Sequence, residues 1–294
     1  MEKVQRLPEW FRQSVPRADR LKALKSSFDE FGLNTVCQSS QCPNLGQCWD
    51  KGVATFMILG DVCTRQCRFC AVQSGVPKAV NLDEPFAIAQ AVKKLNLDYV
   101  VITSVTRDDL DDKGAGHFFE TVIEARRLNP ETKIEVLIPD FLADRKLIEM
   151  VIQARPAVIA HNIETVKRLT PMLRPQADYA RSLSVLKIIK EVNPEIVIKS
   201  GLMLGFGETE IDIDETMKDL LLHGCDILTL GQYLAPSKTS RHVKVEKFIS
   251  LQEFEQYREK ALALGFKCVL SAPLVRSSYL AKEVYEGCLE KVNL

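Results

Sequence analysis

The sequence predicts an α/β protein, a partial (β/α)6 TIM-type barrel whose N-terminal and C-terminal extensions cover the barrel mouth. Short β-branched runs, apolar almost throughout, recur from about residue 53 and are typical of parallel strands covered on both faces. Segments with helical spacing of apolar residues lie between these runs. The chain has 294 residues, 46% hydrophobic and 27% charged, so it is long enough to bury a core of this size.

Strand-then-helix units follow one another through the middle of the chain. The expected strands are 54–59, 99–103, 133–138, 158–161, 196–200 and 227–230. The expected helices are 85–95, 116–128, 144–154, 179–192 and 210–223. Such units, joined by right-handed crossovers, predict a parallel sheet that curls into a full or partial barrel. A doubly wound open sheet is the alternative, although the glycine-rich dinucleotide fingerprint that favours it is missing after the first strand.

We expect three regions. Residues 53–240 form the barrel, because only this region follows the strand-helix rhythm. Residues 1–52 and 241–294 are expected to be extensions that wrap or cap the barrel rather than separate domains.

Composition excludes several classes of protein. Lys and Arg total 39, as do Asp and Glu, so the positive excess typical of nucleic-acid binders is missing. No stretch approaches the ~18 apolar residues that a membrane span needs. The N-terminus lacks the apolar core of a secretory signal, and its acidic residues argue against a transit peptide. We therefore expect a cytoplasmic protein that binds neither nucleic acid nor membrane.

A cysteine motif, C-x3-C-x2-C, directly follows the first predicted strand. It consists of Cys63, Cys67 and Cys70. Without a secretory signal, such a group indicates metal or redox chemistry before disulfides. A cysteine seam on a helix is disfavoured because Arg65 and Arg68 interrupt it; catalytic zinc with three ligands and an open position is a further alternative. An iron–sulfur cube held by three cysteines leaves one iron open to a small molecule, and arginines would offset its negative charge.

A second group of cysteines, Cys37, Cys42 and Cys48, lies upstream of the barrel with the spacing C-x4-C-x5-C. Pro43, Asn44 and Gly46 predict a loop here rather than a helix. With no nearby Cys or His to complete four ligands, a second iron–sulfur site is favoured over structural zinc or reactive thiols. The remaining cysteines, Cys225, Cys268 and Cys288, are expected to be small buried side chains.

The first motif, in its place after a barrel strand and with Phe69 before its last cysteine, resembles radical S-adenosylmethionine (SAM) enzymes. Both motifs together resemble, more closely, the lipoyl synthase family. The resemblance extends over essentially the whole chain, through the segments CPNLGQCW, TSVTRDDL, KSGLMLGFGE, LGQYLAPS and the terminal VRSSY. Departures at Lys113, Ala160, Ala235, Leu251 and residues 38–40 remove no expected ligand.

The resemblance implies two [4Fe–4S] clusters and SAM as cofactors. Cys63, Cys67 and Cys70 would hold the radical-generating cluster. An auxiliary cluster, consumed as the sulfur donor, would be held by three cysteines and a serine of the terminal motif; we favour Ser278 over Ser277. The residues alone predict an ordinary polar turn for that terminal segment, and only the resemblance indicates a cluster ligand there. The auxiliary ligands are therefore expected to be Cys37, Cys42, Cys48 and Ser278.

Polar residues at two strand ends are candidates for contact with SAM or substrate. They are Thr103, Ser104 and Arg107 after the second strand, and Asn162 and Glu164, beside His161, after the fourth. A capped loop and an N-cap cluster are the structural alternatives. Phe69 and Arg174 complete the expected cofactor contacts, and both Arg174 and Lys199 could meet carboxylates. Glycines at 201, 205 and 207 would let backbone approach the cofactor, or serve only the turn.

The expected reaction is insertion of two sulfur atoms, at C6 and C8, into an octanoyl chain carried on a lysine. The expected partners are an octanoylated lipoyl carrier domain (glycine cleavage H protein or 2-oxoacid dehydrogenase E2), an electron donor such as flavodoxin or ferredoxin, and iron–sulfur assembly proteins. Two alternatives remain: another radical SAM enzyme with an accessory cluster, such as a biotin-synthase-like enzyme or a methylthiolase, and a two-cluster electron carrier.

Overall fold

The computed structural model describes residues 7–12, 22, 25–26, 28–50 and 55–292. Its main sheet has the order β1-β2-β5-β6-β7-β8-β9-β10. From β2 to β10 every neighbouring pair is parallel, whereas β1 (Asn34–Thr35) is antiparallel to β2. The parallel strands are β2 (Thr55–Ile58), β5 (Tyr99–Ser104), β6 (Lys133–Leu137), β7 (Val158–Ala160), β8 (Val197–Leu204), β9 (Ile227–Gln232) and β10 (Cys268–Ser271).

This order confirms the partial barrel. Strands that follow one another along the chain are neighbours throughout, so the order never reverses as it does in a doubly wound sheet. β1 and β10 form the two edges of the sheet. All six predicted strands are present, although β8 runs through Leu204, so residues that we expected in a loop belong to a strand.

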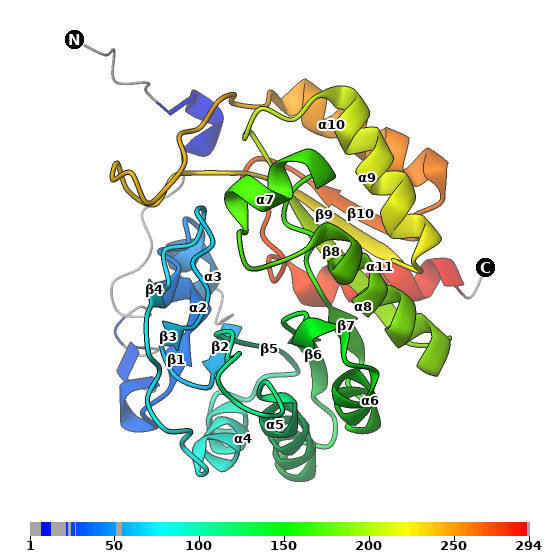
Figure 1. The fold of residues 1–294 in the computed structure, drawn as a ribbon. Helices are drawn as coiled ribbons and strands as arrows, with labels where there is room; N and C mark the ends of the chain where they lie inside the picture. Colours follow the sequence, from blue (N-terminus) through cyan, green and yellow to red (C-terminus); the bar gives the residue numbers. More distant parts are fainter. Residues whose placement is uncertain (1–6, 13–21, 23–24, 27, 51–54, 293–294) are drawn as a thin grey trace.

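Helices cover the outer face of the sheet, as Figure 1 shows. All five predicted helices are found, with ends shifted by at most one residue. They are α4 (Glu84–Lys94), α5 (Ala115–Leu128), α6 (Arg145–Gln153), α8 (Tyr179–Val192) and α9 (Glu210–Leu222). Their apolar faces pack against strands that are buried on both sides, for example β2, in which all four residues are buried. This core fixes the strand ends at which the functional side chains lie.

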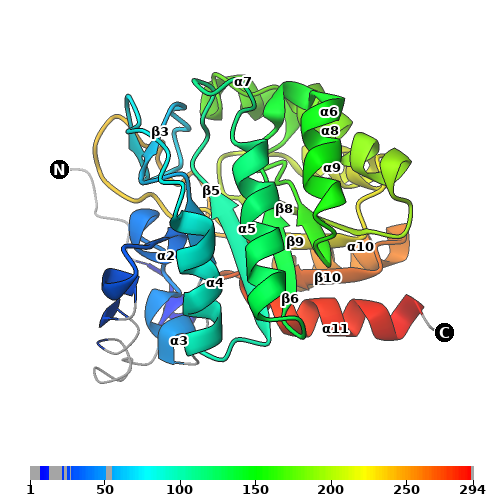
Figure 2. The ribbon, with the colours of Figure 1, turned by 90° about the horizontal axis from the view of Figure 1, so that it is seen from below.

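The C-terminal region continues the strand-helix rhythm, which the sequence did not predict. A capping box between Ser250 and Glu253 begins α10 (Leu251–Leu264), and Gly265 ends it with φ of 118°. The chain then forms β10, which pairs with β9 and adds a seventh parallel strand. α11 (Ala281–Val292) follows and packs beside β10 (Figure 2).

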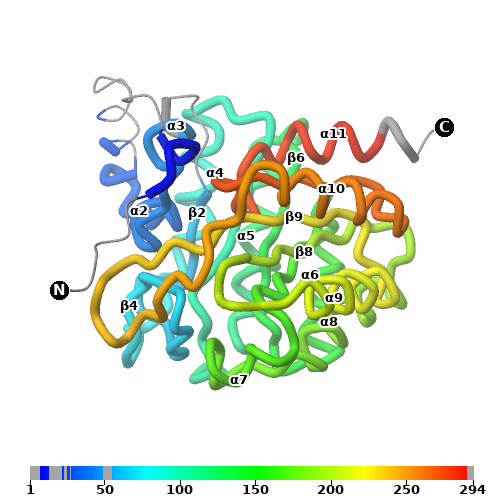
Figure 3. The backbone as a smooth tube through the Cα atoms, turned by 90° about the horizontal axis from the view of Figure 1, so that it is seen from above, coloured from blue at the N-terminus to red at the C-terminus, as the bar shows by residue number. Residues whose placement is uncertain are grey.

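Short elements complete the chain. They are η1 (Glu9–Phe11), α2 (Val36–Ser39), α3 (Leu45–Asp50), β3 (Val62–Cys63), β4 (Gln73–Ser74), η2 (Phe141–Ala143), η3 (Lys167–Leu169) and α7 (Thr170–Leu173). The segment between β9 and α10 crosses to the β3–β4 loop, as Figure 3 shows. Arg241 donates hydrogen bonds there to Val72 O and Ser74 Oγ, and His242 Nε2 donates to Cys70 O. Within the described residues, no helix is long and apolar enough to cross a membrane.

Candidate active site

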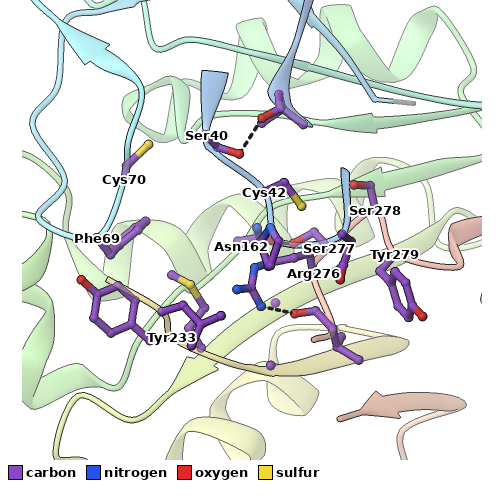
Figure 4. Close-up of a pocket in the computed structure, with 18 of the residues that line it drawn as sticks. Ser40, Cys42, Phe69, Cys70, Asn162, Tyr233, Arg276, Ser277, Ser278 and Tyr279 are labelled. Atoms are coloured by element: carbon purple, nitrogen blue, oxygen red, sulfur yellow. Dashed lines mark hydrogen bonds between the residues drawn. The ribbon is translucent and has the colours of Figure 1, made fainter. Parts of the chain in front are cut away.

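Two adjoining cavities lie on the inner side of the sheet. The larger, of about 380 Å³, is lined by Cys42, Cys48 and Ser278 among others (Figure 4). The smaller, of about 210 Å³, is lined by all three cysteines of the first motif. Residues that line both cavities include Phe69, Cys70, Asn162 and Glu164. The two cysteine groups therefore lie on either side of a shared boundary.

The first cysteine motif lies in a loop between two short paired strands. Val62 and Cys63 of β3 pair with Gln73 and Ser74 of β4, which closes the base of the loop. The residues between them are not helical, so the cysteine-seam alternative does not apply. The N–H groups of Arg65 and Thr106 donate to Cys63 Sγ at 3.4 and 3.3 Å. Two backbone donors thus point at a sulfur that would carry negative charge as an iron ligand.

The other two cysteines of this loop are strongly desolvated. Burial raises the pKa of Cys67, and the neighbouring Arg174 partly opposes this shift. Burial raises the pKa of Cys70 to about 12, and the nearby Cys67 and Cys63 thiols contribute to that rise. The three sulfurs are therefore close enough to influence one another. Binding of a cationic iron site is what would favour their thiolate forms.

Arg65 is a structural ion-pair partner rather than a free counter-charge. Its guanidinium contacts Asp108 and Asp140, each at 2.7 Å, and its side chain is buried. Arg181 also contacts Asp140, at 2.9 Å. Because the Arg65 guanidinium is already paired with two carboxylates, it would offset less of a cluster's negative charge than we expected. No local pattern indicates that Asp140, 75 residues away, belongs to this network.

The smaller cavity presents three buried polar atoms without a hydrogen-bond partner among the described residues. They are Ser104 Oγ, His161 Nε2 and Arg174 Nε. His161 Nδ1 lies 3.0 Å from Ile138 O, so Nδ1 carries the proton and Nε2 is an acceptor. Burial lowers the pKa of His161 to about 4, with Arg174 contributing, so the ring is neutral at pH 7. A hydroxyl, an acceptor nitrogen and a guanidinium donor fit a ligand with amino and carboxylate groups.

Two of the expected cofactor contacts are occupied by other partners. Thr103 Oγ1 lines the smaller cavity and donates to Leu137 O at 2.9 Å. Arg107 pairs with Asp109 at 2.8 Å and donates to Leu59 O at 3.3 Å. Arg107 is not among the residues that line the smaller cavity, so the structure places its side chain away from the other candidates.

Asn162 and Glu164 form the boundary between the cavities. Asn162 Nδ2 donates to Glu164 Oε1 at 3.1 Å, and Asn162 Oδ1 accepts from Ser277 Oγ at 2.8 Å. Burial raises the pKa of Glu164, while Arg174, Asn162 and Arg276 oppose the shift. A carboxyl between two arginines thus connects the strand end with the terminal segment.

The second cysteine motif is not a simple loop, and our expectation was wrong on this point. Cys37 lies in α2 and Cys48 in α3, with Cys42 in the turn that joins them. Thr35 begins α2 by accepting from the Gln38 N–H, a cap that outweighs the turn residues further on. The expected turn is confined to residues 40–44.

The terminal segment docks against this helical pair. Asn44 Nδ2 donates to Leu274 O at 2.5 Å, and Tyr279 Oη donates to Gln47 Oε1 at 3.3 Å. Cys42 lies close to the terminal segment in Figure 4. Burial lowers the pKa of Arg276 in that segment, and the Cys42 thiol partly opposes this shift. Residues more than 200 positions apart in the sequence therefore share one wall of the larger cavity.

Two strand glycines admit the terminal segment. A Cβ on Gly201 would lie 2.8 Å from Ser277 Oγ and 2.9 Å from Asn162 Oδ1. A Cβ on Gly231 would lie 2.1 Å from Val275 O. We expected Gly201 to allow a close approach to the cofactor; in the structure it allows the approach of this segment. Gly205, with φ of 110°, likewise packs against Gln232 and the Lys247 carbonyl.

All nine cysteines lie in the described part of the chain, as thiols rather than disulfides. Within that part, no three His, Cys, Asp or Glu side chains gather closely enough to hold a single metal ion. In an iron–sulfur cube each cysteine binds a different iron, so its ligands are more widely spaced than those of one ion. Three cysteines beside an unpartnered polar cavity fit this kind of group.

The chain matches the radical SAM superfamily over residues 57–220. It is 53% identical over 276 residues to a lipoyl synthase of Caldicellulosiruptor saccharolyticus, covering 94% of this chain and 96% of the relative. It is 50% identical to a lipoyl synthase of Rubrobacter xylanophilus, covering 95% and 86%. The chain belongs to the lipoyl synthase family. Lipoyl synthases are radical SAM sulfurtransferases that use SAM and [4Fe–4S] clusters, and they act on lipoyl carrier proteins.

Solved structures support the fold alone. Methylornithine synthase PylB has a TM-score of 0.55 at 14% identity, covering 90% of this chain and 81% of that chain. The hydrogenase maturase HydG has a TM-score of 0.55 at 12% identity, covering 80% and 62%. For a lipoyl synthase, the two cysteine groups and the cavities between them form the candidate active site.

Proposed function

We propose that this chain inserts two sulfur atoms, at C6 and C8, into an octanoyl chain carried on a lysine of a lipoyl carrier domain. When bound, SAM and its cluster supply a radical that removes hydrogen from carbon, and the auxiliary cluster supplies the sulfur. The protein's own contribution is to hold these groups apart, to orient the acyl chain between them and to exclude water.

Cys63, Cys67 and Cys70 would hold the first cluster and leave one iron for SAM. The unpartnered Ser104 Oγ and Arg174 Nε support SAM binding in the smaller cavity, because they offer groups suited to its amino and carboxylate ends. His161 would remain neutral there, which leaves Nε2 as an acceptor and adds no positive charge beside the SAM sulfonium.

Cys37, Cys42, Cys48 and Ser278 would hold the auxiliary cluster. All four line the larger cavity. Ser277 lines it too, but its hydroxyl already donates to Asn162, which supports Ser278 as the ligand. An alkoxide is a poorer match for cluster iron than a thiolate, so this corner would open most readily when sulfur is removed.

The larger cavity would receive the acyl chain. Its wall includes Phe69, Met203 and Tyr233, and Tyr233 is held in place by stacking on Phe206 with ring centroids 4.2 Å apart. A cavity lined by these apolar side chains and by cysteines of both groups suits a hydrocarbon that must lie between two clusters.

We propose the glycine cleavage H protein or a 2-oxoacid dehydrogenase E2 domain as carrier and flavodoxin or ferredoxin as electron donor. Iron–sulfur assembly proteins would rebuild the consumed cluster. Cytoplasmic location is proposed because cluster ligation requires reduced thiols, which that compartment maintains.

The observation that carries this proposal is that both cysteine groups line adjoining cavities with a shared boundary at Asn162 and Glu164. Mass spectrometry of an octanoyl-lysine peptide, incubated anaerobically with the reconstituted protein, SAM and a strong reductant, tests it. We expect a mass gain of two sulfur atoms, as the 6,8-dithiol formed under the reductant, and loss of two hydrogens only after the dithiol is oxidised to the cyclic disulfide. Formation of 5′-deoxyadenosine with an unchanged peptide would overturn the assignment of this substrate.

A further inference from the structure

A third cavity, of about 310 Å³, lies at the N-terminal end of β5. We name it the rear cavity. Its walls are the turn Leu95–Asp98, the first residues of β5 and the start of α11. Asn96, Asp98 and Glu283 are exposed, so the cavity opens at the surface. This opening is at the end of the parallel strands opposite to the Cys63–Cys70 loop, since Thr106 beside that loop follows the C-terminal end of β5.

The inner end of the rear cavity reaches the second cysteine group. Cys48, Ser278 and Tyr279 line both the rear cavity and the larger cavity. Cys48 and Ser278 are two of the four proposed auxiliary-cluster ligands. Tyr279 is held at the boundary by the hydrogen bond that its Oη donates to Gln47. Cys42, in contrast, lines the larger cavity but not the rear cavity.

The mouth of the rear cavity is bridged by an ion pair that can open at low cost. Lys282 Nζ contacts Asp98, and the two side chains are 40% and 72% exposed. Exposed ion pairs of this kind contribute little to stability, because water screens both charges. Opening the bridge therefore requires little free energy and disturbs no buried side chain.

We propose that the rear cavity is a second entrance to the auxiliary-cluster site, through which iron and sulfide, released by the assembly proteins as low-molecular-weight thiol complexes, reach Cys48 and Ser278. This inference rests on the proposed function, because only a consumed cluster needs to be rebuilt. The larger cavity would be filled by the acyl chain and the smaller one by SAM. A separate entrance lets the site be refilled while those cavities are occupied.

The first test measures access in the cluster-free protein. Iodoacetamide labels the thiols, and mass spectrometry gives the labelling rate of Cys48 relative to Cys42, which serves as the internal reference. Glu283→Trp should narrow the mouth and lower this ratio several-fold, and Asp98→Ala should raise it. Leu289→Trp places the same ring on an exposed position of α11 outside the cavity and should leave the ratio unchanged. Equal ratios in all four proteins would overturn the proposal.

The second test measures delivery. In a Cys63→Ala, Cys67→Ala, Cys70→Ala background, cluster-free protein is reconstituted with ferrous iron, sulfide and dithiothreitol, and cluster absorbance is followed over time. We expect Glu283→Trp to slow cluster formation several-fold and Leu289→Trp to leave the rate of cluster formation unchanged. If both rebuild equally fast, the cavity does not deliver iron and sulfide. Neither readout depends on sulfur insertion, so failure of the proposed reaction would leave this test intact.

Discussion

Replacing Gly201 by Ala tests how the terminal segment is seated. The added Cβ would lie 2.8 Å from Ser277 Oγ, 2.9 Å from Asn162 Oδ1 and 3.0 Å from Thr229 Oγ1, all closer than ordinary carbon–oxygen contacts. Gly201 lies within β8 and its φ is not positive, so alanine adds no backbone strain. The effect on the folded state is therefore one of space, and overpacking of this kind costs about 1–3 kcal/mol.

The closest contact is with a serine that can also be shortened, which allows a double-mutant cycle. Ser277→Ala removes the 2.8 Å contact but leaves the one with Asn162, so the double variant should recover part of the lost stability. Denaturant unfolding of the four cluster-free proteins measures this coupling. Iron analysis after reconstitution should show fewer irons in Gly201→Ala, because Ser278 is displaced with its neighbour. If the Gly201→Ala protein were as stable as the wild type and bound the full amount of iron, the terminal segment would not lie against β8.

Three further predictions concern the site. Cys37→Ala should form 5′-deoxyadenosine but transfer no sulfur, since it affects only the auxiliary cluster; equal loss of both products would contradict this division of roles. Ser278→Ala should abolish sulfur insertion, whereas Ser277→Ala should reduce it mildly through loss of the bond to Asn162; equal, mild effects would refute the serine-ligand assignment. His161 has a pKa of about 4 when folded and about 6.5 when unfolded. Because the unfolded ring takes up a proton first, stability is full above pH 6.5 and falls towards pH 4, by about 2 kcal/mol at pH 5. His161→Gln should flatten this dependence in urea titrations, and an unchanged slope would contradict it.

The fold was largely predictable because its strands are buried on both faces. Runs such as Thr55–Ile58 and Tyr99–Ser104 are apolar and β-branched, and amphipathic helices separate them, so local pattern and tertiary role agree. β10 was missed because the strand is short and its four residues, Cys268–Ser271, are only partly buried. Its place in the sheet depends on pairing with β9, which no local pattern indicates.

The cysteine ligand candidates were predictable from spacing, but their surroundings were not. The ion pairs of Arg65 and the bond from Asn44 to Leu274 join residues that are distant in sequence. The two helices around Cys42 were hidden by the turn residues Pro43 and Gly46, which indicated a continuous loop. Thr35, a residue type that often caps helices, was the signal in the sequence that could have indicated α2.

We expect the two groups of three cysteines to hold separate iron–sulfur cubes. Iron and acid-labile sulfide, measured per chain on anaerobically isolated protein, test this expectation most directly. Two cubes require about eight iron atoms and eight sulfides per chain, four of each for each cube. About four of each, or zinc in place of iron, would contradict it.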